Sequence, residues 1–257
     1  MTSKVVVITG ASGGIGAATA KLLAGRGDKV VLAARRLAEL KQVAEQCGAG
    51  ALPIVTDVTL RADVEHLRDE ALRAFGQVDV WINNAGRAIT RQVLDLTDED
   101  FDQMMAINTK SALYGMQAIV PWFKERGAGH LINVSSALGR IPFVSFRSAY
   151  SAAKAALNSL TANLRMDLHA AYPNIHVSVV MPPMVSSDFA RNALHGTPPP
   201  PGGFRSGATA QTPEQAAAAI VELIDHPRAE IYTNPGQSGM VARYYADVAA
   251  FEENMGR

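Results

Sequence analysis

Short apolar runs alternate along the chain with longer segments in which apolar residues recur every three or four positions. The runs are rich in valine and isoleucine, which is typical of strands buried on both faces of a parallel sheet. They are Val5–Ile8, Lys29–Ala34, Ala51–Thr56, Val78–Ile82, His130–Val134, His176–Met181 and Glu230–Thr233. The segments between them have the spacing of amphipathic helices, expected over residues 14–26, 37–47, 61–75, 97–126, 149–171 and 212–224. This alternation predicts an α/β protein with a doubly wound, mostly parallel, seven-stranded sheet and helices on both faces.

Length and composition favour one domain over residues 1–257, because 48% hydrophobic residues in a chain of 257 can bury a single sizeable core. The 24 basic and 24 acidic residues balance, so there is no electrostatic case for a nucleic acid or an acidic membrane as partner. Cys47 is the single cysteine, which suits a reducing compartment. Neither a signal peptide nor an apolar run of about 20 residues is apparent. We therefore expect a cytoplasmic protein.

A glycine-rich turn follows the first strand. Gly10 is followed by Ser12, Gly13, Gly14, Ile15 and Gly16, and an alanine-rich helix comes next. Strand, glycine turn and helix, in that order, predict a Rossmann-type dinucleotide-binding unit. Gly10 permits a tight turn, and Gly14 and Gly16 permit close approach of a pyrophosphate, which the helix N-terminus attracts through its free N–H groups.

The end of the second strand bears on the choice of cofactor. An acidic residue there would bind the adenosine ribose of NAD, but the chain has Ala34 followed by Arg35 and Arg36. Paired guanidinium groups suit a 2′-phosphate. This pattern predicts that NADP(H) is preferred over NAD(H), and the alternative is two solvated arginines at the start of a helix.

Tyr150 and Lys154 are four residues apart in a predicted helix, so both side chains lie on one face. A free phenol titrates near ~10, and a neighbouring positive charge favours the phenolate. We therefore expect Lys154 to lower the pKa of Tyr150 and Tyr150 to exchange a proton with a carbonyl or an alcohol. The alternative is an ordinary pair on a surface helix.

The turn Thr9–Gly16, the Tyr-x-x-x-Lys pair and the quartet Asn83–Gly86 together resemble the short-chain dehydrogenase/reductase family, over about residues 4–190. The resemblance implies a catalytic tetrad of Asn108, Ser136, Tyr150 and Lys154. In that family the serine orients the substrate, the lysine also holds the nicotinamide ribose, and the asparagine lies at a helix kink. There it holds a water that connects the lysine to solvent.

The resemblance also implies further cofactor contacts. Asp57 and Val58 would lie against the adenine, and the alternative for Asp57 is a helix N-cap. The other expected cofactor residues are Asn84, Ala85, Gly86, Pro182, Val185 and Ser187.

The chain departs from the family pattern at two places. Pro183 replaces a glycine, and Ser136 and Tyr150 are fourteen positions apart, one more than is usual. We expect the extra residue in the loop 140–147, and Ser135 becomes the candidate if the register shifts instead.

These features predict an NADP(H)-dependent oxidoreductase that interconverts a carbonyl and a secondary alcohol, with no metal site. Loops near the expected pocket hold Phe143, Phe146, Met184, Phe189 and Phe204. They favour a small or medium apolar substrate, and the alternative is that they pack in the core or in an interface. The proline-rich segment of about 186–212 is expected to be a substrate loop, and about 239–257 a C-terminal tail that packs on its own chain. The family suggests a homodimer or homotetramer. The alternatives are a catalytically silent NADPH-binding sensor or scaffold, and another Rossmann-like enzyme such as a methyltransferase, which would not use Tyr150 and Lys154.

Overall fold

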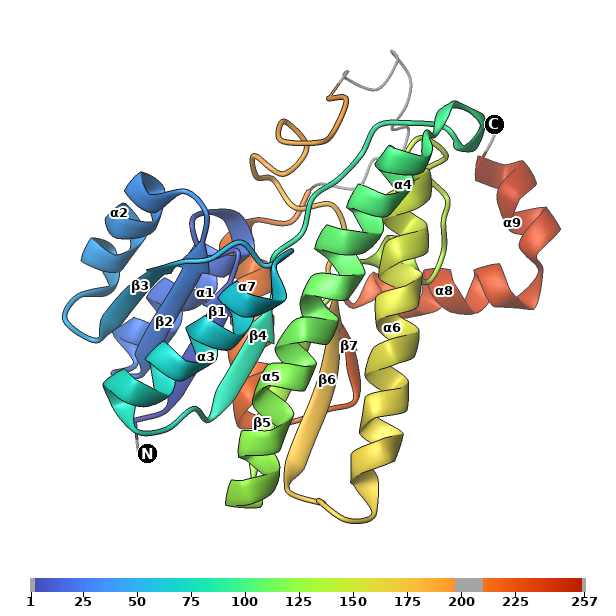
Figure 1. Ribbon diagram of the computed structural model, residues 1–257. Coiled ribbons are helices and arrows are strands. Elements are labelled where there is room, and N and C mark those ends of the chain that lie inside the picture. Colours follow the sequence, from blue (N-terminus) through green and yellow to red (C-terminus); the bar gives the residue numbers. More distant parts are fainter. Residues whose placement is uncertain (1–2, 197–209, 256–257) are drawn as a thin grey trace.

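The computed structural model describes residues 3–196 and 210–255, and these form a parallel sheet with helices on both faces (Figure 1). The strands are β1 Val5–Thr9, β2 Lys29–Ala34, β3 Ala51–Val55, β4 Val80–Asn83, β5 Gly129–Val134, β6 Ile175–Met181 and β7 Glu230–Tyr232. Their order is β3-β2-β1-β4-β5-β6-β7, and every registered pair is parallel. The predicted doubly wound, seven-stranded sheet is confirmed. The strand order reverses between β1 and β4, where open α/β sheets have a ligand crevice.

Helices cover both faces of the sheet (Figure 1). They are α1 Gly14–Gly25, α2 Leu37–Cys47, α3 Arg61–Phe75, α4 Asp98–Met105, α5 Ser111–Arg126, α6 Ser148–His169, α7 Pro213–Asp225, α8 Gly236–Ala246 and α9 Val248–Met255. Alternate residues of β1 divide the core into two clusters, as the period of a strand requires. Val5 and Val7 pack with α3, α5 and α6, whereas Val6 and Ile8 pack with α1, α2 and α7.

The segment expected to form one helix over 97–126 is divided in the structure. α4 and α5 are joined by a π-helical segment, Ala106–Lys110, that contains Asn108. Thr97 caps α4 through a capping box with Asp100, in accord with the predicted start. A single wider turn of this kind commonly occurs at a functional site, which makes Asn108 a residue of interest.

The C-terminal tail is more regular than its sequence suggests. It forms α8 and α9, and the ring of Tyr244 meets the rings of Tyr245 and Phe251 edge-on, with centroids 5.3 and 5.4 Å away. The Tyr245 hydroxyl donates to the carbonyl oxygen of Arg140 at 3.0 Å. The tail therefore packs on the loop after β5 of its own chain.

Buried amides connect the central strands to α6. Asn83 donates to the Oδ1 of Asn133 at 2.9 Å, and Asn133 donates to the Oγ1 of Thr161 at 2.9 Å. The indole of Trp81 donates to the Oδ1 of Asn83 at 2.8 Å. Such satisfied polar networks set the relative positions of the elements that carry them, and here those elements are β4, β5 and α6. No helix in the described part of the chain is long and apolar enough to cross a bilayer.

Candidate active site

The turn after β1 requires glycine at two positions for steric reasons. Gly10 has a φ of +67°, and a Cβ there would lie 2.8 Å from the Cα of Ala85. A Cβ on Gly16 would lie 2.4 Å from the carbonyl oxygen of Gly10. The turn is thus folded against the segment after β4 and against itself, with no room for a side chain at Gly10 or Gly16.

The N-terminus of α1 is open toward a cavity. Its N-cap residue, Gly13, makes no side-chain cap bond, so the first N–H groups of the helix can meet an anion. A cavity of about 290 Å³ adjoins this turn, bounded by Ser12, Gly13, Gly14 and residues of α1, α2 and the start of α7. The cavity runs along the flank of α1 as far as Lys21, and its edge at Ser12, Gly13 and Gly14 reaches the first turn of the helix.

Arg36 lies beside the glycine turn. Its guanidinium donates to the Oγ of Ser12 at 3.1 Å and pairs with Glu39 at 3.1 Å. Arg35 points instead to Asp57, with 3.9 Å between the charged atoms. Both arginine side chains are more than half exposed, so these surface pairs are weak and can exchange for a better anion.

Asp57 holds its own loop. Its Oδ1 accepts from the N–H and the hydroxyl of Thr59 at 3.0 and 2.7 Å. The N-cap of α3 is Leu60, so the alternative reading of Asp57 as the helix cap is wrong. Val58, next in the chain, is buried in the core cluster on the α3 side.

Asn84 and Thr9 tie the glycine turn to β4. The Asn84 amide donates to the carbonyl oxygen of Thr9 at 2.9 Å, and the Thr9 hydroxyl accepts from the N–H groups of Asn84 and Ala85 at 3.0 and 3.1 Å. The sequence analysis placed Asn84 and Ala85 in the site and gave no role to Thr9. The feature of the sequence that could have indicated this role is the position of Thr9, directly before Gly10 in the turn motif.

Ser136 and Tyr150 meet at the carboxyl end of β5. Tyr150 is the third residue of α6 and is buried, and the nearby Ser136 hydroxyl, which accepts from the N–H of Leu138 at 3.2 Å, acts to lower the pKa of the phenol. Ser135 points elsewhere, since its hydroxyl donates to the carbonyl oxygen of Lys154 at 3.3 Å. The geometry therefore favours Ser136 over Ser135 as the serine beside the phenol.

Lys154 is buried one turn after Tyr150. Its Nζ donates to the carbonyl oxygen of Val134 at 2.9 Å and lies 5.8 Å from the centroid of the Tyr150 ring. Burial lowers the pKa of Lys154 to about 7. A Cβ on Gly86 would lie 3.4 Å from this Nζ and 2.9 Å from the Oδ1 of Asn108. The side chains of Lys154 and Asn108 therefore both approach the main chain of Gly86.

The electrostatic balance at Tyr150 differs from the expectation that Lys154 lowers its pKa. Burial raises the pKa of Tyr150 to about 12, while the Ser136 hydroxyl and the charge of Arg147 act in the opposite direction. Lys154 contributes little because its own burial disfavours its charge. Sequence reasoning missed Arg147, since a basic residue three positions before a tyrosine is common on surface helices.

The loop after β6 joins the cofactor turn to the tyrosine. Pro182 accepts from the N–H of Ala137 at 3.0 Å, and Val185 forms a bridge with Gln211. Ser187 lies over the glycine turn, 3.6 Å from the place of a Cβ on Gly14. The ring of Phe189 meets Tyr150 edge-on at 5.6 Å.

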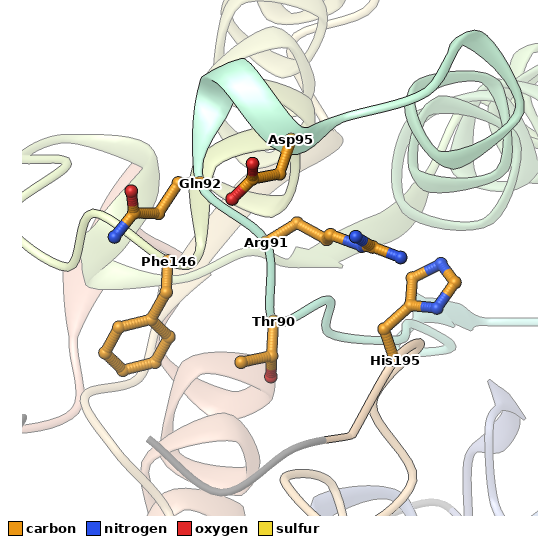
Figure 2. Close-up of a pocket in the computed structure, with 6 residues that line it drawn as sticks. All are labelled: Thr90, Arg91, Gln92, Asp95, Phe146 and His195. Carbon is orange, nitrogen blue, oxygen red and sulfur yellow. The ribbon is translucent and has the colours of Figure 1, made fainter. Parts of the chain in front are cut away.

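A second cavity, of about 500 Å³, opens where three loops meet (Figure 2). Its lining is mostly polar, and the residues are Thr90, Arg91, Gln92, Asp95, Phe146 and His195. His195 has a φ of +52° and its ring bonds the buried Asp100 at 2.6 Å. Burial alone would raise the pKa of Asp100, but its bonds to His195 and Thr97 lower it overall. Within residues 3–196 and 210–255 no cluster of three His, Cys, Asp or Glu side chains could hold a metal.

Comparisons with known proteins agree with this arrangement. Residues 4–197 match the model of the family described as short chain dehydrogenase. The uncharacterized oxidoreductase YxnA of Bacillus subtilis is 34% identical over 236 residues, which are 90% of this chain and 65% of that protein. Among solved structures, a short chain dehydrogenase/reductase from Burkholderia phymatum in complex with NAD superposes with a TM-score of 0.86 at 28% identity, covering 96% of this chain and 95% of the other. An alcohol dehydrogenase from Thermococcus sibiricus complexed with 5-hydroxy-NADP gives a TM-score of 0.76 at 26% identity, with coverage of 90% and 96%.

Proposed function

The chain belongs to the short chain dehydrogenase family, and we propose that it interconverts a carbonyl and a secondary alcohol by hydride transfer with a nicotinamide cofactor. The observation that carries the proposal is the buried Tyr150 phenol, whose ring centroid lies 5.8 Å from the Nζ of the buried Lys154 and whose pKa the Ser136 hydroxyl acts to lower. These groups lie at the carboxyl ends of the strands, where ligands of such sheets bind. A bare binding protein would have no need of a phenol and an amine so close together in the core.

A nicotinamide dinucleotide suits the residues of the glycine turn. The uncapped N-terminus of α1 would hold the pyrophosphate, with Ser12, Gly13, Gly14 and Ile15 nearest to it. The related structures contain NAD in one case and a hydroxylated NADP in another, so they do not decide between the two. We propose NADP(H), because Arg36 lies beside Ser12 and no acidic residue ends β2.

The side chains of the site would act on the substrate oxygen. Ser136 and Tyr150 would bind it, and Tyr150 would donate its proton during reduction of the carbonyl. A pKa of about 12 keeps Tyr150 protonated at neutral pH, which is the state that a proton donor needs. Lys154 and Asn108 would return a proton from solvent, and a bound nicotinamide would supply the hydride.

The surroundings of Tyr150 support an apolar reactive end on the substrate. Phe189 lies against the phenol and Met184 is half exposed on the same loop. A small or medium apolar ketone or aldehyde therefore fits best, and the polar cavity of Figure 2 lies among other loops of the chain. Phe204 of the expected aromatic set lies outside the described residues.

We further propose that the protein assembles as a homodimer or homotetramer. Apolar side chains on the outer faces of α4 and α6 support this, since Phe101 and Met166 are 44% and 75% exposed. Sedimentation velocity over a range of protein concentrations tests it. A purely monomeric protein at micromolar concentration would contradict it.

One set of measurements tests the function. Titration with NADPH and NADH by fluorescence should show binding, and a panel of apolar carbonyls should show cofactor oxidation by absorbance. Tyr150→Phe should keep binding and lose about 10³-fold or more of turnover, because it removes the proton donor. Tyr172→Phe is the matched control, since that ring also faces a lysine, Lys124, at 5.1 Å. Turnover that survives in Tyr150→Phe would refute the role of the phenol, and binding without turnover in the wild type would favour a sensor.

A further inference from the structure

Arg147 stands immediately before α6, three positions ahead of Tyr150. Its guanidinium reaches the carbonyl oxygen of Ile89, a residue of the same buried apolar cluster as Tyr150. Tyr150 is also in the first turn, where the helix N-terminus adds a partial positive charge. The start of α6 therefore directs positive charge toward the phenol from two sources.

The Arg147 guanidinium is fixed in place. Its Nη1 donates to the carbonyl oxygen of Ile89 at 2.8 Å and to the hydroxyl of Thr90 at 3.2 Å. The guanidinium carbon lies 5.5 Å from the centroid of the Phe146 ring. The main chain is held too, by a bridge between Arg147 and Arg91. This charge cannot easily swing away.

The charge of Arg147 is also uncompensated. None of the ion pairs between the described residues includes Arg147. Its partners are neutral oxygens and an aromatic face. An unpaired cation in a partly buried place acts more strongly on its neighbours than a neutralised pair does.

Lys154 cannot supply the same effect at all pH values. Its ammonium donates to Val134, and burial lowers its pKa to about 7, so it loses its charge in the range where alcohols are oxidised. Arginine stays protonated throughout. Among the described residues, Ser136 and the apolar Ile89, Met104, Ala149 and Phe189 also lie near Tyr150, and none of these carries charge.

We propose that Arg147 is a positioning residue whose fixed charge stabilises the phenolate form of Tyr150. This rests on the proposed function, because it assigns the charge a purpose in proton exchange with the substrate. The two side chains also influence each other reciprocally: Arg147 lowers the pKa of Tyr150, and Tyr150 opposes the lowering of the Arg147 pKa by burial. Removal of the charge should make the phenol harder to ionise.

A pair of substitutions separates charge from structure. Arg147→Gln keeps an N–H donor for Ile89 and removes the charge, whereas Arg147→Lys keeps the charge and loses the fork geometry. For alcohol oxidation, kcat/KM should rise with pH. At a fixed alkaline pH below the Tyr150 pKa, Arg147→Gln should lower kcat/KM by about tenfold, the loss expected if the pKa of the phenol rises by about one unit. Arg147→Lys should stay close to the wild type. If Arg147→Gln fails to fold, Arg147→Met, which keeps the stem against Phe146, takes its place.

A second readout needs no turnover. NMR of protein labelled with ¹³Cζ-tyrosine follows each phenol, and the Tyr150 signal is the one absent from Tyr150→Phe. At the highest pH at which the fold survives, Arg147→Gln should show a smaller ionised fraction at Tyr150 than the wild type. An unchanged titration, or an equal shift in Arg147→Lys, would overturn the inference. A wild type that titrates as expected but turns over no substrate would instead count against the proposed function alone.

Discussion

The side chain of Asn108 is paired at both of its ends with the main chain of Arg87. Its Oδ1 accepts from the Arg87 N–H at 3.1 Å, and its Nδ2 donates to the Arg87 carbonyl at 2.9 Å. The same amide donates to the carbonyl of Met104 at 3.1 Å, within the wide helical turn. One buried residue therefore connects the irregular helix to the segment that passes Lys154.

Replacement of this residue should be costly. We expect Asn108→Ala to lower the free energy of unfolding by about 2–3 kcal/mol, because buried groups of Arg87 are left unpaired. Activity should fall further than stability explains, since Gly86 would shift beside Lys154. Denaturant unfolding and steady-state rates measure both effects. Asn163→Ala is the control, because that amide bonds Ser159 on the exposed face of α6; an equal loss in the two variants would contradict the assignment.

The glycine turn allows a steric test. Gly16→Ala should destabilise the protein by about 2–3 kcal/mol and abolish nucleotide binding, because its Cβ would overlap Gly10 and Asn84. Gly25→Ala in the same helix meets no atom within 4 Å and should stabilise it by up to about 1 kcal/mol. Thermal unfolding and fluorescence titration check the pair. Normal nucleotide binding in folded Gly16→Ala would show that the turn does not hold the cofactor.

Cofactor preference should follow Arg36. Arg36→Leu should weaken NADPH binding about tenfold or more, a change of about 1.4 kcal/mol, and leave NADH binding nearly unchanged. Arg73→Leu, which removes another exposed arginine, paired with Glu70 on α3, controls for net charge. Competition titrations with both nucleotides measure the ratio. Equal weakening for NADPH and NADH would argue against recognition of a 2′-phosphate.

His130 should make the protein sensitive to acid. Burial, aided by His176, lowers its pKa to about 3. Among the described residues, no acceptor lies within hydrogen-bond distance of its Nδ1, so a proton added there would make no hydrogen bond. Between about pH 6.5 and 3 the unfolded chain binds a proton that the folded chain does not, so stability falls with falling pH by up to about 1.4 kcal/mol per unit. His130→Gln should flatten this slope in urea unfolding. The exposed His169→Gln should leave it as it is.

Lys154 should make the free energy of unfolding depend on pH between neutral and alkaline values. Its pKa of about 7 in the folded protein lies below the ordinary value near ~10.4. Over that window the unfolded chain holds the extra proton, so stability rises with pH. Lys154→Met should be the more stable protein at acidic pH, by about 1–3 kcal/mol, and should lose this advantage toward pH ~10. Lys41→Met, on the exposed face of α2, should show no such trend; an equal trend there would refute the explanation.

Local patterns predicted the sheet well because each strand is specified by a few adjacent residues. The β-branched run of β1 and the glycine turn after it stand in the structure where the sequence analysis expected them. The same holds for Tyr150 and Lys154, whose relation depends only on the geometry of one helix. The spacing between Ser136 and Tyr150 left Ser135 as an alternative to Ser136, and only the folded positions of the two serines distinguish them.

Properties that depend on burial and on distant loops could not be predicted in this way. Whether the Tyr150 pKa rises or falls depends on how fully the phenol is covered, and Phe189, which helps to cover it, lies far along the chain. The side chain of Asn108 in the π-helical turn likewise contacts Arg87, and the periodicity of apolar residues in a helix cannot predict a contact between such distant positions. The pairing of His195 with Asp100 is of the same kind.

The position of β1 in the middle of the sheet has a consequence during synthesis. β1 emerges from the ribosome before β4, which is one of its two neighbours and places Trp81 opposite Val7. Until residues 80–83 have left the exit tunnel, one edge of β1 presents unpaired N–H and C=O groups, a template for contact with other nascent chains. We therefore expect the yield of native protein in cells to depend on chaperones that shield this edge while translation continues.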